Sequence, residues 1–411
     1  MPADKSSRTG NQGIYCHFFS VELKLLVNRY LSRVHMQIEV FDNLADVPRE
    51  KWNQVLEGQS RVCSYEFCQV VEQSRLNDFD YLYLLISDDA GRPLGLACSY
   101  TITTDLAIFS PRWLKRILEK VRALFPGFLR VRMQECGTPI TLAAPIAMMD
   151  RRNLQELVTA IASTLEDVAR RRRAFLIVVR DFDEPDNDMM QAFSKRGYRT
   201  VDNLPNTCLD VEWNSIDEYT AAMKSYYRSK LLRHVRRIRE QGVTCSLVED
   251  FGHLAEQLCE QWLTVHNQAD EYQREVITPE FYREFSRLPG GRSRVLLFHR
   301  ATELIGHAVL FFDNGLLRWL FFGRSRAAND SLYMFAGYKV IETAIDAKVK
   351  HLELGLTTYS VKKDLGARMV PLRMALKSPR RFVNPFISIF YPLLNSVPAV
   401  QNRSVFKKKL P

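Results

Sequence analysis

The stretch GRSRAANDSLYMFAGYKVIETAIDAKVKHLELGLTTYSVKKDLGA, residues 323–367, decides the fold. Apolar residues at helical spacing predict a long helix over 332–347, and the apolar run HLELGL predicts a strand over 351–356. A short helix through Leu365 follows and ends at Gly366, and a further strand is expected over 369–376. This alternation of helix and strand is typical of an α/β protein.

Elements of the same kind precede this stretch. Strands are expected over 295–300, 304–312 and 316–322, and helices fill most of the chain from 211 to 288. The first half of the chain repeats the design with strands over 81–87 and 94–102, an amphipathic helix over 113–124, a helix over 154–173 and a strand over 174–179. The pattern predicts two α/β units of about 170 residues each. An unduplicated α/β chain, in which strands and helices merely alternate, is the other interpretation.

These elements divide the chain into four predicted regions. Residues 1–35 form a polar tail and an amphipathic helix over 18–34, residues 36–204 the first unit, residues 205–378 the second unit, and residues 379–411 a basic and apolar tail. The prediction places both units in one chain of ordinary globular composition, which is 46% hydrophobic and 25% charged.

Positive charge is concentrated in two blocks. The 411 residues carry 57 Lys and Arg against 47 Asp and Glu, and seven of the basic residues lie after residue 376, where no acidic residue occurs. Residues 219–239 hold seven more without an acid. Such blocks indicate an anionic partner, whether nucleic acid, a phospholipid surface or a phosphate-rich co-substrate.

Cysteine and hydropathy patterns exclude several classes of protein. The eight Cys residues form no C-x-x-C pair and no His pair has zinc spacing, so we expect neither a metal site nor a disulfide framework. No apolar run reaches 18 residues, which argues against a spanning helix. The polar N-terminal residues lack the order of a signal peptide, so we expect a cytoplasmic protein.

The motifs LYMFAGY, LELG and SVKKDLG within residues 323–367 resemble the branch of the GNAT superfamily that includes the Fem peptidyltransferases and related acetyltransferase-like proteins. The basic segment SYYRSKLLRHVRRIREQG, residues 225–242, is similar to the stretch that opens the second Fem-type unit. The resemblance covers about residues 206–377 and, more loosely, the first half. It implies an α/β fold of tandem GNAT-like domains, each a mixed, mostly antiparallel sheet flanked by helices.

One part of the GNAT pattern is missing. GNAT enzymes carry a glycine-rich loop that binds the coenzyme A pyrophosphate at the start of the long helix, and residues 323–330 lack those glycines. We expect Arg324, Arg326 and Asn329 to contact the acyl donor instead, together with Lys363, which matches the family's Lys. The resemblance implies acyl-CoA or an acyl carrier protein as co-substrate, with no permanently bound cofactor and no metal.

Acyl transfer to an amine needs a group that accepts the amine's proton and a donor for the developing oxyanion. Glu353, in the middle of a predicted buried strand, is the first candidate for the general base, although a buried ion pair would account for it equally well. His307 is the second candidate, with a hydrogen-bonded core His as the alternative. Tyr359 is a candidate proton donor, and Tyr333 and Tyr338 are expected to line the cleft.

The C-terminal tail and one helix are candidates for contact with an anionic surface. Arg380 and Arg381 precede FVNPFISIFYPLL, which is too short to span a bilayer and is interrupted by Pro385 and Pro392, so we expect no regular helix there. Packing of this segment back on the domain is the alternative. The basic residues expected at the surface are Lys407, Lys408 and Lys409 in the tail and Arg233, Arg236 and Arg237 in the basic helix.

The sequence therefore predicts an N-acyltransferase that moves an acyl group from an acyl thioester to a primary amine. The resemblance to bacterial ceramide-synthase-type proteins favours an amine on a lipid, such as a sphingoid base, and a location on the inner face of a membrane. Two alternatives remain: a Fem-like transferase that uses aminoacyl-tRNA on a cell-wall precursor, and an inactive module that binds an acyl group or a lipid.

Overall fold

A computed structural model describes residues 36–77, 79–106, 110, 112–144, 146–268, 275–326, 331–395 and 397–407. The helix predicted over 18–34 lies outside these residues, as do Asn329, Lys408 and Lys409.

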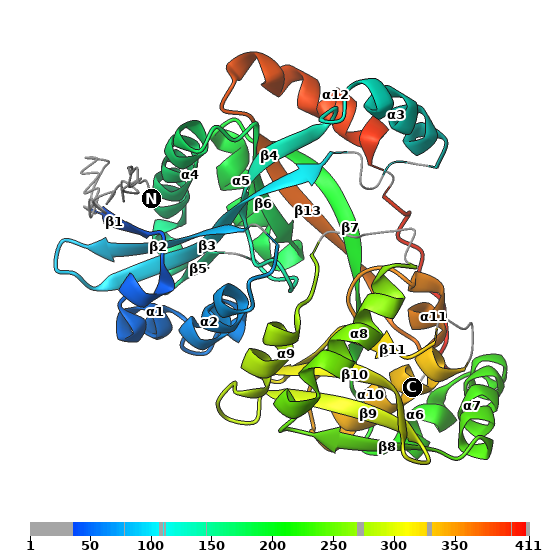
Figure 1. Cartoon of the computed structure of the whole chain (residues 1–411). Helices are drawn as coiled ribbons and strands as arrows, with labels where there is room; N and C mark the ends of the chain where they lie inside the picture. The colour runs from blue at the N-terminus through cyan, green and yellow to red at the C-terminus, as the bar shows by residue number, and fades with distance from the viewer. Residues whose placement is uncertain are drawn as a thin grey trace, which may run out of the picture.

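One twisted sheet runs through the described chain (Figure 1). Its strands follow the order β1-β2-β3-β4-β6-β13-β7-β12-β11-β10-β9-β8, with the short β5 paired to β3. Only the pairs β4–β6 and β11–β12 are parallel among these strands; the other pairs are antiparallel. The strands are β1 (Met36–Phe41), β2 (Asp80–Asp88), β3 (Pro93–Asp105), β4 (Arg130–Cys136), β5 (Ile146–Met148), β6 (Leu176–Phe182), β7 (Arg199–Asp210), β8 (Val243–Val248), β9 (Ser293–Arg300), β10 (Glu303–Asp313), β11 (Leu316–Arg324), β12 (His351–Glu353) and β13 (Arg368–Lys377).

Helices cover both faces of the sheet. Helices α4 and α5 pack on one face of the first half, and α6, α7 and α10 pack on one face of the second. Helices α1, α2, α8 and α9 share a single hydrophobic cluster that joins the halves, in which Phe67 lies 5.0 Å from Phe311 between ring centroids. The helices are α1 (Arg49–Val55), α2 (Tyr65–Gln73), α3 (Arg112–Leu124), α4 (Leu154–Arg171), α5 (Asn187–Lys195), α6 (Ile216–Ala222), α7 (Ser225–Glu240), α8 (Ala255–His266), α9 (Pro279–Ser286), α10 (Leu332–Asp346), α11 (Tyr359–Asp364) and α12 (Asn384–Leu394).

The two halves exchange strands at the centre of the sheet. Strand β13, at the end of the second half, lies between β6 and β7 and pairs with both of them. Strand β7 in turn pairs with β12 of the second half. The boundary expected between residues 204 and 205 therefore falls inside a strand, because β7 contributes to both halves of the sheet.

Most predicted elements agree with the structure, and the differences have local causes. The strand expected over 351–356 ends at Glu353, since Gly355 has a φ of 74° and Thr357 and Thr358 are also left-handed. A helix, α12, forms where prolines were expected to prevent one. Pro385 occupies its first turn, where no N–H donor is required, and Pro392 lies near its end.

The last described residues, Phe406 and Lys407, pack on the second half of the molecule. Phe406 lies against Trp213 and Tyr219, with ring centroids 4.9 and 5.9 Å away. Gly366, at a φ of 87°, makes room for it, because a Cβ there would lie 2.4 Å from the Phe406 ring. Lys407 donates to the carbonyl oxygens of residues 221 and 222, so this cation is attached to the protein surface.

Among the described residues, we find no helix with the length and apolar character needed to cross a bilayer.

The strand exchange predicts that the halves do not fold separately. Residues 36–204 expressed alone lack β13, so β6 loses its central partner and exposes apolar surface. We expect this fragment to remain unfolded by circular dichroism, and the whole chain to unfold in one calorimetric transition. Two separate transitions, or a folded fragment, would contradict the prediction.

Candidate active site

A cavity opens where two parallel strands part. Strands β11 and β12 pair from Leu316 with His351 to Arg318 with Glu353 and then diverge. Leu320 is an extra residue opposite β10, where the register shifts between Val309 and Leu310, and this bulge bends β11. The left-handed turn after β12 leads its chain away from β11.

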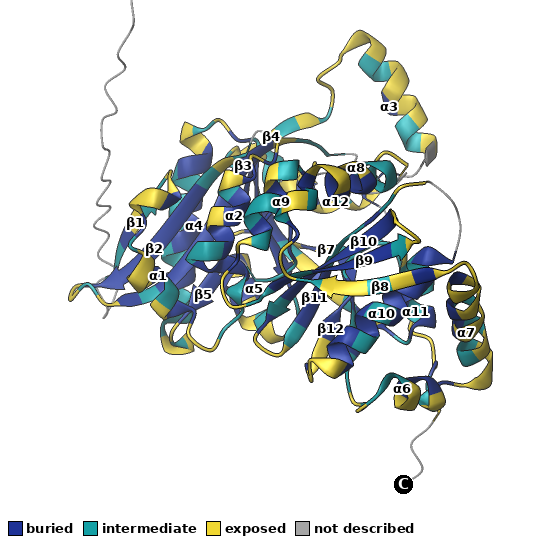
Figure 2. Ribbon diagram, turned by 60° about the horizontal axis from the view of Figure 1, so that its bottom comes forward, coloured by how far each residue is buried: buried dark blue, intermediate teal, exposed yellow. Residues whose placement is uncertain are grey.

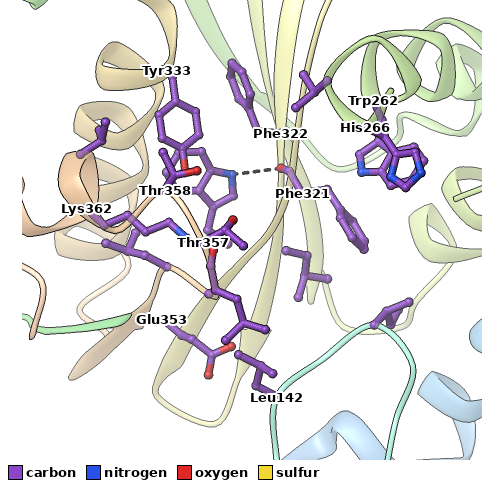
Figure 3. Close-up of a pocket in the computed structure, with 18 of the residues that line it drawn as sticks. Leu142, Trp262, His266, Phe321, Phe322, Tyr333, Glu353, Thr357, Thr358 and Lys362 are labelled. Atoms are coloured by element: carbon purple, nitrogen blue, oxygen red, sulfur yellow. Dashed lines mark hydrogen bonds between the residues drawn. The ribbon is translucent and has the colours of Figure 1, made fainter. Parts of the chain in front are cut away.

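The cavity has a volume of about 850 Å³ and lies at the junction of the two halves. Residues 139–142 of the first half form part of its wall, and β11, the turn after β12, α7, α8, α10 and α11 supply most of the rest (Figure 3). Its size falls within the range usual for small-molecule sites. The apolar lining consists of Trp262, Trp319, Leu320, Phe321, Phe322, Tyr333, Leu354 and Leu356, with further contributions from Ile140 and Leu142.

Packed aromatic rings form one side of the cavity. Tyr333 stacks on Trp319 with centroids 5.1 Å apart and meets Phe322 edge-on at the same distance. The Trp319 indole N–H donates to the Phe321 carbonyl oxygen at 3.0 Å (Figure 3). Burial raises the pKa of Tyr333, against the effect of a hydrogen bond to Thr358, so its phenol stays protonated near neutral pH.

Lys362 places an amine in this cavity. Its side chain, on α11, is only 3% exposed, and its ammonium group donates to the Leu356 carbonyl oxygen. Burial lowers the pKa of Lys362 to about 7, despite the opposing charge of Glu353. Because a buried amine is disfavoured in its charged form, Lys362 can take up and release a proton near neutral pH.

Glu353 lies at the base of the cavity in a buried ion-pair network. Its Oε2 accepts from Arg318 at 2.6 Å, and Arg318 also bonds Asp313 at 3.2 Å. Asp313 accepts from the Ser60 hydroxyl and the Arg61 backbone N–H, both at 2.6 Å, so the network connects the halves. Burial raises the pKa of Glu353, and Arg318 and Asn206 act in the opposite direction. Glu353 thus forms the buried ion pair that the sequence analysis gave as the alternative to a general base.

His307 lies outside the cavity. Its ring is fully buried, and its nitrogens pair with the Gln261 side-chain oxygen and the Tyr282 hydroxyl, each at 2.9 Å. Burial lowers its pKa to about 3. A Cβ at Gly323 would lie 2.1 Å from this ring, so the strand is shaped around it. This geometry matches the hydrogen-bonded core His that was its alternative.

The other predicted site residues divide into two groups. Tyr333 and Arg324 line the cavity. Tyr359 donates to the Pro205 carbonyl oxygen at 3.0 Å and is directed elsewhere, and Tyr338 packs against Phe335 in the core of the second half. The residues outside the cavity lining are Tyr338, Tyr359, Lys363 and Arg326.

Lys362 is the residue that sequence reasoning set aside in favour of its neighbour. Val361 and Leu365 form the inner face of α11, since Leu365 is fully buried and Val361 lines the cavity. Lys362 follows Val361 and lies three positions before Leu365, so the helical phase directs it inward and Lys363 more toward solvent. In the sequence, the four-residue spacing of Val361 and Leu365 was the signal that favoured Lys362 over Lys363 as the inward-facing lysine.

Cationic and imidazole groups border the cavity on the side of α7. Lys230, which bonds Asp364 at 2.6 Å, and His234, which pairs with Ser331 at 2.9 Å, line it together with Arg324. The basic face of α7 is exposed, as the pattern predicted, and Leu231, Val235 and Ile238 are buried. Within the described segments, no cluster of three or more His, Cys, Asp or Glu side chains could hold a metal ion.

Residues 43–359 match the FemAB-like family, whose description is peptidoglycan biosynthesis/recognition. The chain belongs to the FemAB-like family. It is thereby an acyltransferase-type protein of the GNAT superfamily, as the motifs of residues 323–367 indicated.

Curated relatives share part of their length with this chain. Proteins of two Mycobacterium tuberculosis strains, CDC 1551 / Oshkosh and H37Rv, bear the name "Putative 8-amino-7-oxononanoate synthase 2" and are 28% identical over 321 residues. The match covers 75% of this chain and 41% of the relatives, so it spans less than half of their length.

Solved structures confirm the tandem GNAT-like fold. FemX aligns with a TM-score of 0.53 and 10% identity, over 86% of this chain and 100% of that one. The C-terminal domain of a "Putative Lysylphosphatidylglycerol Synthetase" from Agrobacterium fabrum aligns with a TM-score of 0.52 and 12% identity, over 84% and 97%. A mixed, mostly antiparallel α/β sheet in two related units is therefore the architecture of this family member.

The buried network predicts a large effect of Arg318→Met on stability. The change leaves the Glu353 and Asp313 carboxylates buried without their cation, and we expect a loss of about 3–5 kcal/mol in the free energy of unfolding. Arg49→Met is the matched control, because Arg49 forms an exposed pair with Glu66 at 2.8 Å and should cost less than about 1 kcal/mol. Denaturant unfolding measures both, and similar losses would contradict the structural role of the network.

Proposed function

We propose that this protein is an N-acyltransferase that moves a fatty acyl group from a thioester to the primary amine of a lipid, such as a sphingoid base. The observation that carries the proposal is the juxtaposition of Lys362, buried with a pKa of about 7, and an apolar cavity of about 850 Å³. The aromatic and aliphatic part of the lining offers apolar partners to a lipid acceptor.

The aromatic and aliphatic lining suits an acyl chain. Burying hydrocarbon against Trp262, Phe321 and Leu356 gains roughly 0.8 kcal/mol per methylene, so a long chain would be bound mainly by this wall. Lys230 and Arg324, cationic lining residues, would contact the phosphates of a coenzyme A or carrier-bound donor.

Lys362 is the proposed general base. In its neutral form, one N–H donates to the Leu356 carbonyl oxygen and the lone pair remains available to the cavity. The lone pair accepts the proton that the attacking amine loses as the new amide bond forms and the thiolate departs. The Tyr333 phenol, still protonated, is a candidate donor to the leaving sulfur.

This assignment predicts a pH-dependent rate. We expect kcat/KM of the wild type to rise as Lys362 loses its proton, with an apparent pKa of about 7. Lys362→Met should lower kcat/KM about 100-fold or more and remove this limb of the profile. Lys363→Met is the matched control and should retain activity. Equal losses in both variants, or an unchanged profile in Lys362→Met, would contradict the role of Lys362.

The acceptor is identified by mass spectrometry of lipid extracts from cells with and without the gene. We expect loss of an N-acylated lipid and accumulation of its free amine, and complementation with Lys362→Met should fail to restore the product. Complementation with Lys363→Met should succeed. Full restoration by Lys362→Met would favour an inactive binding module in place of an enzyme.

A Fem-like transferase that uses aminoacyl-tRNA is the second candidate. The observation in its favour is that α7, which exposes Arg233, Arg236 and Arg237, also contributes Lys230 and His234 to the cavity lining. RNA phosphates bound along α7 would place an aminoacyl end near the site. An unchanged lipid profile with altered cell-wall peptides, and activity abolished by ribonuclease, would support this candidate over lipid acylation.

A further inference from the structure

Helix α3 exposes part of its apolar side. In a globular protein the apolar side of an amphipathic helix normally packs on the core. Here Trp113, Ile117 and Leu124 are 63%, 50% and 78% exposed, whereas Leu118 is buried. Figure 2 shows α3 standing out from the body of the molecule, with exposed residues along most of its length. The part of the apolar side formed by Trp113, Ile117 and Leu124 therefore lacks a covering element within the described chain.

Helix α12 exposes apolar side chains in the same manner. Ile387 packs inward on β6 and β13 residues, with Tyr391 partly buried beside it. Ile389, Phe390 and Leu393 point away from that cluster and are 59%, 54% and 62% exposed. Ile387 and Tyr391 thus attach α12 to the sheet. The opposite side of the helix exposes aliphatic and aromatic side chains to solvent.

The two helices lie at one end of the molecule. The Ser110 hydroxyl, just before α3, donates to the carbonyl oxygen of Leu394, the last residue of α12, at 2.7 Å. Figure 1 draws both helices together at the top of the view, away from strands β8, β9, β10 and β11. Phe125 and Phe128, which follow α3, are also exposed. We call α3, residues 125–128 and α12 the α3–α12 surface.

Charge at this surface is positive. Arg116 and Lys120 are exposed on α3, whose single acidic residue is Glu119. Arg380 and Arg381, just before α12, are exposed as well, and no Asp or Glu occurs from residue 377 to the end of the chain. Exposed aromatic and aliphatic groups flanked by Lys and Arg complement a bilayer interface that contains anionic headgroups.

We propose that the α3–α12 surface docks on an anionic phospholipid bilayer. The helices, of 13 and 11 residues, lie in the interface with Trp113, Ile117 and Leu393 among the acyl chains and the basic side chains at the phosphates. Helix α7 offers charge with less exposed apolar surface, because Leu231, Val235 and Ile238 are buried and Tyr226 is its one apolar side chain more than half exposed. Docking does not depend on the chemistry proposed for the cavity.

The apolar anchor is tested by flotation of the full chain with vesicles of phosphatidylcholine, with and without phosphatidylglycerol. We expect the wild type to float with the anionic vesicles and the combined variant Trp113→Ala, Ile117→Ala, Leu393→Ala to lose about tenfold or more of its partitioning. Leu247→Ala, an exposed apolar residue of the edge strand β8, is the matched control and should bind as the wild type does. Thermal unfolding midpoints of both variants should match the wild type.

The charge contribution is tested with a second pair of variants. Arg116→Glu with Lys120→Glu should weaken binding to anionic vesicles about tenfold and reduce its dependence on salt. Arg236→Glu with Arg237→Glu, on α7, is the control of equal charge change and should bind nearly as the wild type does. Loss of binding only in the α7 variant would overturn the proposal by assigning the membrane contact to α7.

Other outcomes also decide the proposal. A wild type that floats with neither vesicle overturns it, and so does concentration-dependent dimerisation that the apolar variant abolishes, because a second copy would then cover the surface. Lys362→Met should float as the wild type does. The apolar variant should retain its rate on a short, water-soluble amine, so a failed acyl-transfer proposal and a failed docking proposal remain distinguishable.

Discussion

The position of β13 constrains the rest of the molecule. Strand pairing requires each central strand to have a partner on both edges, and β6 and β7 each use β13 for one of theirs. The last strand of the second half thus completes the sheet of the first, and β7 completes the sheet of the second. The two halves are held at a defined angle by backbone hydrogen bonds, and the surface between them is fixed accordingly.

The cavity forms at this fixed junction. The parallel pair β11–β12 holds for three residues and then opens, and residues 139–142 of the first half close the space from the other side. Arg318 stands where the pair opens, bonded to Glu353, to Asp313 and to the Leu142 carbonyl oxygen at 2.8 Å. The same guanidinium therefore orders the base of the cavity and the contact between halves, which explains why a cation is buried there despite its desolvation cost.

The two ionisable groups Lys362 and Glu353 lie in different surroundings within the cavity. Lys362 is almost fully buried, and this desolvation lowers the pKa of the amine. Glu353, which could hold a proton in an apolar pocket, instead faces Arg318. The neighbouring groups thus set the pKa of Lys362 and the ion pairing of Glu353 in different ways. Cationic side chains lie apart from both, at Lys230 on α7 and at Arg324.

Periodicity and local chemistry in the sequence determined most of the helices and strands, the relation to GNAT proteins through residues 323–367, and the amphipathic character of α3 and α7. These depend on neighbouring residues. The tertiary structure alone decided that β13 enters the first half, that His307 is enclosed while Lys362 reaches the cavity, and that α3 exposes part of its apolar side. Each of these depends on partners distant in the chain, and a local pattern shows that a face is apolar without showing what, if anything, covers it.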